Sequence, residues 1–259
     1  MLEQRQPVLC AFSVAGYPDE RAGVEALVAY ARNGASVLEV GAPTTDPWLD
    51  GPVIAAAHRR ALRSGGGDGV AVTLATVRQV SALTRQPVVV MSYWATVAAR
   101  GPQRMANELA ASGASGCMVA DIPPEEVESW TAAAARAGIS APLLAGREAP
   151  PGELAAVCRA ATGFVYAPAV AGQRTGYSDG LDLEALASFV ASVRRAAPRT
   201  PVLSGIGVST PGLAASVARR TGVNGVVIGS PLIRAYADGG PDAAVGLLGE
   251  FAASVSRAR

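Results

Sequence analysis

The segment YARNGASVLEV, residues 30–40, contains the pattern that decides the fold: a helix-like end, a glycine and a short apolar strand. The same pattern returns in residues 109–119, 135–144 and 219–228. In each copy the glycine suits the left-handed position that ends a helix. The strand that follows is apolar on both faces, as parallel strands between helices require. The chain is therefore predicted to alternate helices with buried parallel strands.

Reading the whole chain in this way gives about eight strands with helical stretches between them. The strands are predicted to start near Val8, Ser36, Val88, Gly116, Pro142, Gly163, Val202 and Gly225. Helices are predicted over residues 21–33, 68–83, 125–137 and 183–197. Eight such units in 259 residues predict an α/β fold, a single (β/α)8 TIM barrel forming one domain over residues 1–259. A doubly wound open sheet is the alternative, but the first strand lacks the Gly-x-Gly-x-x-Gly turn of a dinucleotide site.

The composition excludes several classes of function. The chain has 22 basic residues against 21 acidic ones and a net charge of +1, so nothing indicates a surface for nucleic acid. No run of about 18 uncharged apolar residues is present, so no membrane span is expected. The sequence contains no lysine, which rules out Schiff-base chemistry and covalently held pyridoxal phosphate.

Cysteine and histidine usage favours a reducing compartment and argues against a metal site. Cys10, Cys117 and Cys158 are scattered in apolar surroundings, which favours a cytoplasmic protein with small buried thiols. His58 has no partner at metal-ligand spacing and precedes two arginines in a helical stretch, so it is predicted to be a surface residue. The apolar run 6–16 is interpreted as the first buried strand, and not as a signal peptide.

Several reactive side chains are predicted to meet at the mouth of the barrel, where the strands have their C-terminal ends. Glu39 lies near that end of the second strand, and Asp50 lies in the following loop. Tyr93, Asp121 and Tyr166 come at the ends of the third, fourth and sixth strands. A carboxyl on an apolar strand is expected to have a raised pKa through desolvation, which suits a general acid/base. The alternative is that Glu39 pairs with an arginine.

Two glycine turns late in the chain indicate a phosphate site. Ser204-Gly-Ile-Gly-Val208 follows the seventh strand, and Ile228-Gly-Ser230 follows the eighth and leads into a helix. Backbone N–H groups at a helix N-terminus bind phosphate, and barrels often place such a site after strands seven and eight. Thr175 and Gly176, in the long loop after the sixth strand, could close over the same phosphate. The alternative is that the glycines serve only to make tight turns.

A set of motifs then follows one order along nearly the whole chain. They are Phe12-Ser-Val-Ala-Gly-Tyr-Pro18, Leu38-Glu-Val-Gly-Ala-Pro43 with Asp46-Pro47 and Asp50-Gly-Pro52, Val119-Ala-Asp-Ile-Pro123, Thr175-Gly176, Ser204-Gly-Ile-Gly207 and Gly229-Ser230. Together they resemble the tryptophan synthase alpha chain family. The block from Glu39 to Asp50 is the specific part of the resemblance, because many phosphate-binding barrels share the glycine turns.

The resemblance implies retro-aldol cleavage of indole-3-glycerol phosphate to indole and glyceraldehyde 3-phosphate, with no metal and no cofactor. It implies that Glu39 is the general acid/base, and that Asp50 hydrogen-bonds the indole N–H and stabilises the positive charge that develops on the ring. The other substrate-binding residues that it implies are Phe12, Tyr93, Tyr166 and Thr175, with Gly176, Gly205, Gly207, Gly229 and Ser230 around the phosphate. In the family a beta chain is the partner that turns the released indole into tryptophan.

The chain departs from the family in loops that cover the site and contact the beta chain. It has Thr44-Thr45 where Phe-Ser is usual, and Trp48 where Leu is common. It has Trp94-Ala-Thr96 where an Asn is expected in the middle position, and its loop 167–176 is one residue longer. These departures weaken the expectation of a beta partner more than the expectation of the chemistry.

Besides a different phosphorylated substrate, two alternatives to a partner-dependent lyase therefore stay open. The first is a stand-alone lyase of specialised metabolism, for which the changed loops are the motive. The second is a non-catalytic regulatory subunit that binds a phosphorylated ligand. Retention of both Glu39 and Asp50 favours catalysis over the second alternative.

Overall fold

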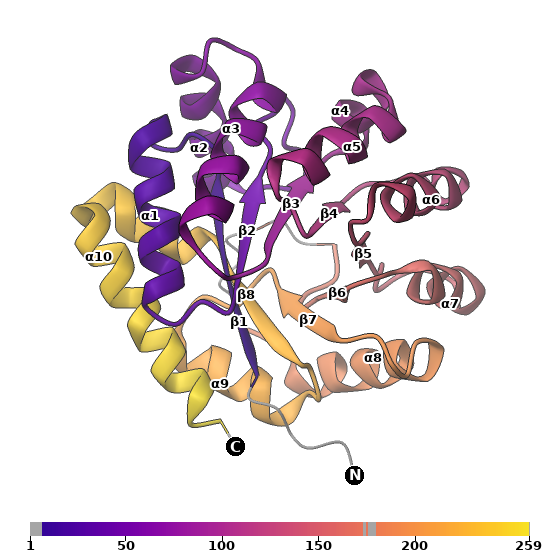
Figure 1. The fold of residues 1–259 in the computed structure, drawn as a ribbon. Coiled ribbons are helices and arrows are strands. Elements are labelled where there is room, and N and C mark those ends of the chain that lie inside the picture. The colour runs from indigo at the N-terminus through magenta and orange to yellow at the C-terminus, as the bar shows by residue number, and fades with distance from the viewer. Residues whose placement is uncertain (1–6, 173–174, 176–179, 259) are drawn as a thin grey trace.

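The centre of the molecule is a ring of eight parallel strands, and helices surround it (Figure 1). The computed structural model describes residues 7–172, 175 and 180–258. The strand order β4-β3-β2-β1-β8-β7-β6-β5 places the first strand beside the last. The strands are β1 Val8–Val14, β2 Val37–Gly41, β3 Val88–Ser92, β4 Gly116–Val119, β5 Leu143–Leu144, β6 Val165–Pro168, β7 Val202–Gly205 and β8 Gly225–Ile228.

The ring is nearly closed, and its weakest seam lies between β4 and β5. There a bridge between Gly116 and Ser140 joins the two edges. Cys117 donates its backbone N–H to the Ser140 carbonyl at 2.9 Å, and Ser140 donates to the Ser115 carbonyl at 3.0 Å. The predicted (β/α)8 barrel is therefore confirmed.

The predicted strand starts agree with the observed ones to within two residues. The largest difference is at β6, which was expected from Gly163 and begins at Val165. Gly163 has a φ of 81°, a left-handed value that belongs to the turn before the strand and not to extended backbone. Glycines play the expected role at helix ends too, since Gly113 and Gly138 end α5 and α6 in the left-handed conformation.

The helices lie outside the ring, and several begin at a side-chain cap. They are α1 Glu20–Arg32, α2 Pro52–Ser64, α3 Gly69–Leu83, α4 Trp94–Arg100, α5 Pro102–Ser112, the 3-10 turn η1 Pro124–Glu126, α6 Val127–Ala137, α7 Pro151–Ala160, α8 Leu183–Ala196, α9 Pro211–Arg220 and α10 Ser230–Ser256. Asp19, Asp68, Asp182 and Thr210 accept hydrogen bonds from backbone N–H groups in the first turns of α1, α3, α8 and α9.

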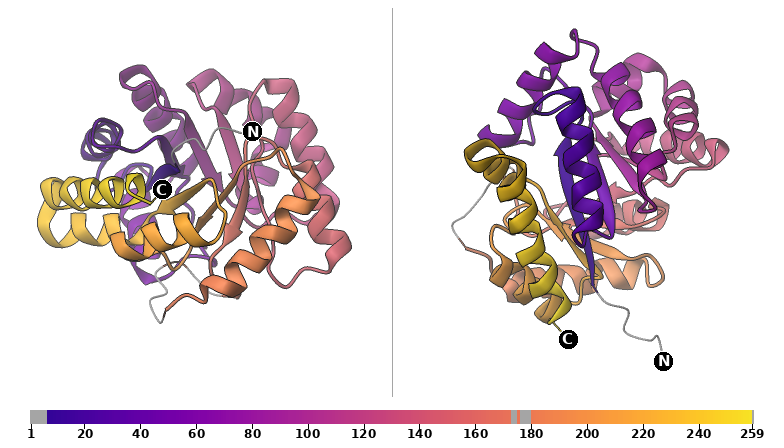
Figure 2. Two further views of the ribbon diagram at one scale, coloured as in Figure 1. Left: turned by 90° about the horizontal axis from the view of Figure 1, so that it is seen from below. Right: turned by 60° about the vertical axis from the view of Figure 1, so that its left-hand side comes forward.

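α10 is two helical pieces joined at a kink, where Gly240 has a φ of 76° and Pro241 follows. Figure 2 shows α1 and α10 side by side, and both pack against β1. None of the helices in the described part of the chain is both long and apolar enough to cross a membrane.

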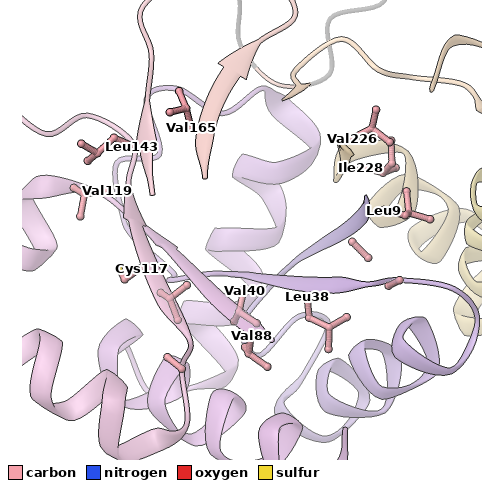
Figure 3. Packing of buried hydrophobic residues seen from close by; sticks show 14 of the residues in the cluster. Leu9, Leu38, Val40, Val88, Cys117, Val119, Leu143, Val165, Val226 and Ile228 are labelled. Atoms are coloured by element: carbon pink, nitrogen blue, oxygen red, sulfur yellow. The ribbon is translucent and has the colours of Figure 1, made fainter. Parts of the chain in front are cut away.

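Two apolar layers account for strands that are hydrophobic on both faces. Leu9, Leu38 and Val40 point outward, into the layer between the strands and the helices (Figure 3). Cys10 and Phe12 belong to the second layer, which fills the barrel interior. Because side chains alternate along a strand, β2 turns Leu38 and Val40 outward and leaves the residue between them facing the interior.

Candidate active site

A cavity opens among the C-terminal ends of the strands. Its empty volume is about 650 Å³, which includes open solvent. The residues that line it are Phe12, Glu39, Leu49, Asp50, Ile54, Met91, Met118, Ala120, Leu144, Tyr166, Thr175, Ile206, Gly207, Val208, Val227, Gly229, Ser230 and Pro231. Most of these are apolar, so the cavity suits a hydrophobic ligand, and its lining also carries the two carboxyl groups of Glu39 and Asp50.

Glu39 is the inward residue of β2 and is only 3% exposed. In register it sits between Phe12 of β1 and Val89 of β3, which are both apolar. Its Oε1 atom has no hydrogen-bond partner within the described residues. Burial, and secondly the charge of Asp50, raise the pKa of Glu39 to about 8. The raised pKa favours the protonated form of this carboxyl at neutral pH.

Asp50 lies in the loop before α2 and is 4% exposed, and a side-chain hydroxyl donates to each of its carboxylate oxygens. The Tyr93 hydroxyl donates to Oδ2 at 2.8 Å, and the Thr175 hydroxyl donates to Oδ1 at 3.2 Å. The His58 ring places Nε2 3.3 Å from Oδ2. Burial first, and then the charge of Asp50, raise the pKa of the Tyr93 hydroxyl far above its usual value, so Tyr93 acts as a neutral donor.

Thr175 reaches Asp50 from the segment after β6 because a glycine lets the two backbones approach. Gly51 donates its N–H to the Thr175 hydroxyl oxygen at 2.8 Å, and Thr175 donates its own N–H to the Leu49 carbonyl at 3.3 Å. A Cβ on Gly51 would collide with the Thr175 carbonyl oxygen. Glycine at this position is thus needed for the contact between the loop after β2 and the segment after β6.

The structure corrects the prediction for His58. It was expected at the surface, and it is fully buried. α2 buries Ile54, Ala57, His58 and Ala61 on one face, at the three- and four-residue spacing of a helix stripe. The apolar neighbours at those spacings were the signal that sequence reasoning missed, since the adjacent Arg59 and Arg60 suggested a solvent-facing turn.

The phosphate residues that were predicted fall into three groups. Gly207, Gly229 and Ser230 line the cavity, and Ser230 begins α10. Gly205 does not line it; it instead makes room for Tyr166, because a Cβ there would collide with the Tyr166 hydroxyl. Gly176 lies outside the described residues.

Tyr166 and Phe12 line the cavity. Tyr93 does not line it, but its hydroxyl donates a hydrogen bond to Asp50, which does. Burial, and secondly the charge of Glu39, raise the pKa of Tyr166 well above its usual value. Asp121 does not line the cavity. Its carboxylate accepts the Trp94 backbone N–H and, at 3.0 Å, the indole N–H of Trp48, so it joins loops after three strands.

Metal-ligating side chains do not gather anywhere in residues 7–172, 175 and 180–258: no group of three or more His, Cys, Asp or Glu could hold an ion there.

Comparison with known proteins gives one consistent answer. The family model described as "Tryptophan synthase alpha chain" matches residues 1–250. The chain is 37% identical to the tryptophan synthase alpha chain of Streptomyces coelicolor over 97% of its own length and 90% of that protein. It is 36% identical to that of Gloeobacter violaceus over 98% and 90%. A solved structure of Mycobacterium tuberculosis tryptophan synthase superposes with a TM-score of 0.86 at 36% identity, covering 97% and 93% of the two chains.

Proposed function

The chain belongs to the tryptophan synthase alpha chain family, whose members are carbon–carbon lyases, and we propose that Glu39 and Asp50 carry out its reaction. The reaction is cleavage of indole-3-glycerol phosphate to indole and glyceraldehyde 3-phosphate. The observation that supports these roles best is the pairing, in one apolar cavity, of a buried, proton-holding carboxyl with a second carboxyl that accepts hydrogen bonds from Tyr93 and Thr175.

The first step is transfer of the Glu39 proton to carbon 3 of the indole ring. The ring thereby gains a positive charge that is shared with its nitrogen, and the Asp50 carboxylate accepts a hydrogen bond from the ring N–H. A preorganised charge at the place where the opposite charge develops lowers the barrier, because it needs no reorganisation during the step. The hydrogen bonds from Tyr93 and Thr175 hold the Asp50 carboxylate in position before the reaction begins.

The second step breaks the bond between the ring and the glycerol chain. The Glu39 carboxylate, now without its proton, takes the proton of the hydroxyl on the carbon attached to the ring. The electrons of the O–H bond form the aldehyde, and those of the carbon–carbon bond return to the ring and neutralise it. Glu39 ends the cycle protonated, so the residue serves as acid and then as base.

The lining of the cavity offers a surface for each part of the substrate. Phe12, Met91 and Tyr166 offer a buried apolar wall for the indole ring. Gly207, Gly229 and Ser230 offer the phosphate a glycine turn and the start of a long helix. This combination of lining residues supports a phosphorylated aromatic substrate.

We place the reaction in a reducing compartment such as the cytoplasm. Cys10, Cys117 and Cys158 are all buried free thiols, and such thiols are usual in that environment.

The expected partner is a tryptophan synthase beta chain, which would accept the released indole. Trp48 is 50% exposed, and it lies in the same loop as Asp50. A protein that docks on this loop would therefore influence the position of Asp50. We expect a saturating beta chain to raise kcat for indole release roughly 10-fold or more, since small errors in positioning are costly. The measurement is the rate of indole release from indole-3-glycerol phosphate by the purified chain, with and without the beta chain.

A stand-alone lyase is the second candidate, and one observation favours it. Among the described residues, Tyr93 and Thr175 already donate hydrogen bonds to both oxygens of Asp50, an orientation that would need no contribution from a partner. Brisk indole release that a beta chain leaves unchanged would establish this candidate in place of the partner-dependent one.

A further inference from the structure

We infer that His58 is a positioning residue for Asp50: its imidazole ties the Asp50 carboxylate to the backbone of the loop that carries it. The inference rests on the role proposed above for Asp50 and goes beyond it. His58 lies on the buried face of α2, eight residues after Asp50 in the sequence, and it does not line the cavity. It would act on the substrate only through Asp50.

The hydrogen bonds of the ring define which nitrogen carries the proton. Nδ1 accepts the backbone N–H of Thr44 at 3.2 Å, so in the neutral ring the proton is on Nε2. Nε2 lies 3.3 Å from Asp50 Oδ2. This contact is longer and less well aligned than the Tyr93 hydrogen bond, and the N–H acts on the carboxylate as a nearby dipole.

The contact between Nε2 and Asp50 matters because Nε2 is shielded from water. His58 is fully buried, and within the described residues Nε2 has no hydrogen-bond partner of good geometry. A buried N–H that turns away from its acceptor loses interactions that water cannot replace. The Asp50 carboxylate, 3.3 Å away, is therefore the charged group toward which this buried N–H is attracted.

The arrangement also leaves the carboxylate one free direction. An ionised carboxyl offers about four acceptor positions. Tyr93 donates a hydrogen bond to Oδ2 and Thr175 donates one to Oδ1, while the His58 N–H lies 3.3 Å from Oδ2 without the geometry of a hydrogen bond. The indole N–H can then take an acceptor position that these groups leave open. Without His58, Oδ2 would keep a single donor, and the carboxylate could rotate away from the ring nitrogen.

His58 also connects the two ends of the loop between β2 and α2. Thr44 stands near its beginning and Asp50 at its end, and the imidazole lies between them. A purely structural role would need only the Thr44 contact. A positioning role needs the Asp50 contact, and the two can be separated by substitution.

Asparagine and glutamine form a matched pair for this purpose. In His58→Asn the side-chain oxygen takes the place of Nδ1 and can accept the Thr44 N–H, but no donor reaches Asp50. In His58→Gln the longer side chain brings an N–H donor to the place of Nε2, and the Thr44 contact is lost.

The experiment measures kcat and KM for indole release, together with thermal unfolding, in both variants. We expect His58→Asn to lower kcat roughly 10- to 100-fold with little change in KM, because misplaced groups lose transition-state stabilisation. His58→Gln should retain a kcat near that of the unsubstituted chain. An Asn variant that is as active as the Gln variant, or losses that follow unfolding temperature alone, would overturn the inference.

Asp50→Asn, measured in the same assay, separates this inference from the proposed function. If Asp50→Asn is as active as the unsubstituted chain, the role of Asp50 fails. If Asp50→Asn is impaired and the two His58 variants have equal kcat, only the positioning role fails. In the Asp50→Asn background the two His58 substitutions should give equal rates, since they act through the lost carboxylate.

Discussion

Replacing Glu39 by Gln is expected to lower kcat for indole release about 10²- to 10⁴-fold, the usual contribution of a proton-transfer residue. Gln keeps the shape of the side chain and removes the proton that must reach the ring. Glu39 is 3% exposed, so water cannot easily substitute for the missing acid. The measurement is kcat from initial rates at saturating indole-3-glycerol phosphate.

The control for Glu39→Gln is the same change on an exposed helix. Glu25 of α1 forms an exposed ion pair with Arg21, and Glu25→Gln should leave kcat unaltered. Thermal unfolding of both variants checks that they fold. A Glu39→Gln chain that releases indole at the unsubstituted rate would remove Glu39 from the mechanism.

The second large effect is expected at Asp50. Asp50→Asn should lower kcat about 10²- to 10³-fold, the cost of losing one preorganised group that stabilises developing charge. The amide has nearly the shape of the carboxylate but cannot balance the positive charge of the ring. KM should change less than kcat, because the charge exists only after the proton has been transferred.

A matched control for Asp50→Asn is Tyr93→Phe, which leaves the charge and removes one of its donors. Its effect on kcat should be smaller than that of Asp50→Asn. If Asp50→Asn raised KM and left kcat intact, Asp50 would bind substrate equally before and during the reaction, and charge stabilisation would not be its role.

Local signals were sufficient to predict the fold. Gly113 and Gly138 end helices in the left-handed conformation, and each precedes a buried strand, as the repeated pattern requires. Strands that are apolar on both faces indicated two layers of packing, and both layers are present. The start of β6 was predicted two residues too early because Gly163 adjoins the apolar residues of the strand in the sequence. Its left-handed φ, which the sequence does not report, places it in the preceding turn.

The site was only partly predictable, because some of its contacts join residues that are far apart in the sequence. Glu39 stood out because an acid on an apolar strand is costly to bury without a purpose. The contact of Thr175 with Gly51 joins residues 124 positions apart, and no local pattern reports it. His58 could have been found, because its spacing to Ile54 and Ala61 places it on the buried stripe of α2.

Gly205 shows a second reason why the site residues could not all be predicted from the sequence. A glycine that binds a phosphate and a glycine that admits a neighbouring side chain look alike in sequence. Here Gly207, with a φ of 100°, lines the cavity, whereas Gly205 gives space to the Tyr166 hydroxyl. The difference depends on which large side chain lies on the adjacent strand.

The measurement that tests the central claim most directly is the pH dependence of kcat/KM for indole release. The claim is that the reaction begins from protonated Glu39, whose pKa is raised to about 8 by burial. Because kcat/KM reports groups of the free enzyme, it should decline as pH rises through about 8, by roughly tenfold per unit beyond it. A kcat/KM that rises between pH 7 and 9 would contradict the account, since the ionised carboxylate would then be the form that starts the reaction.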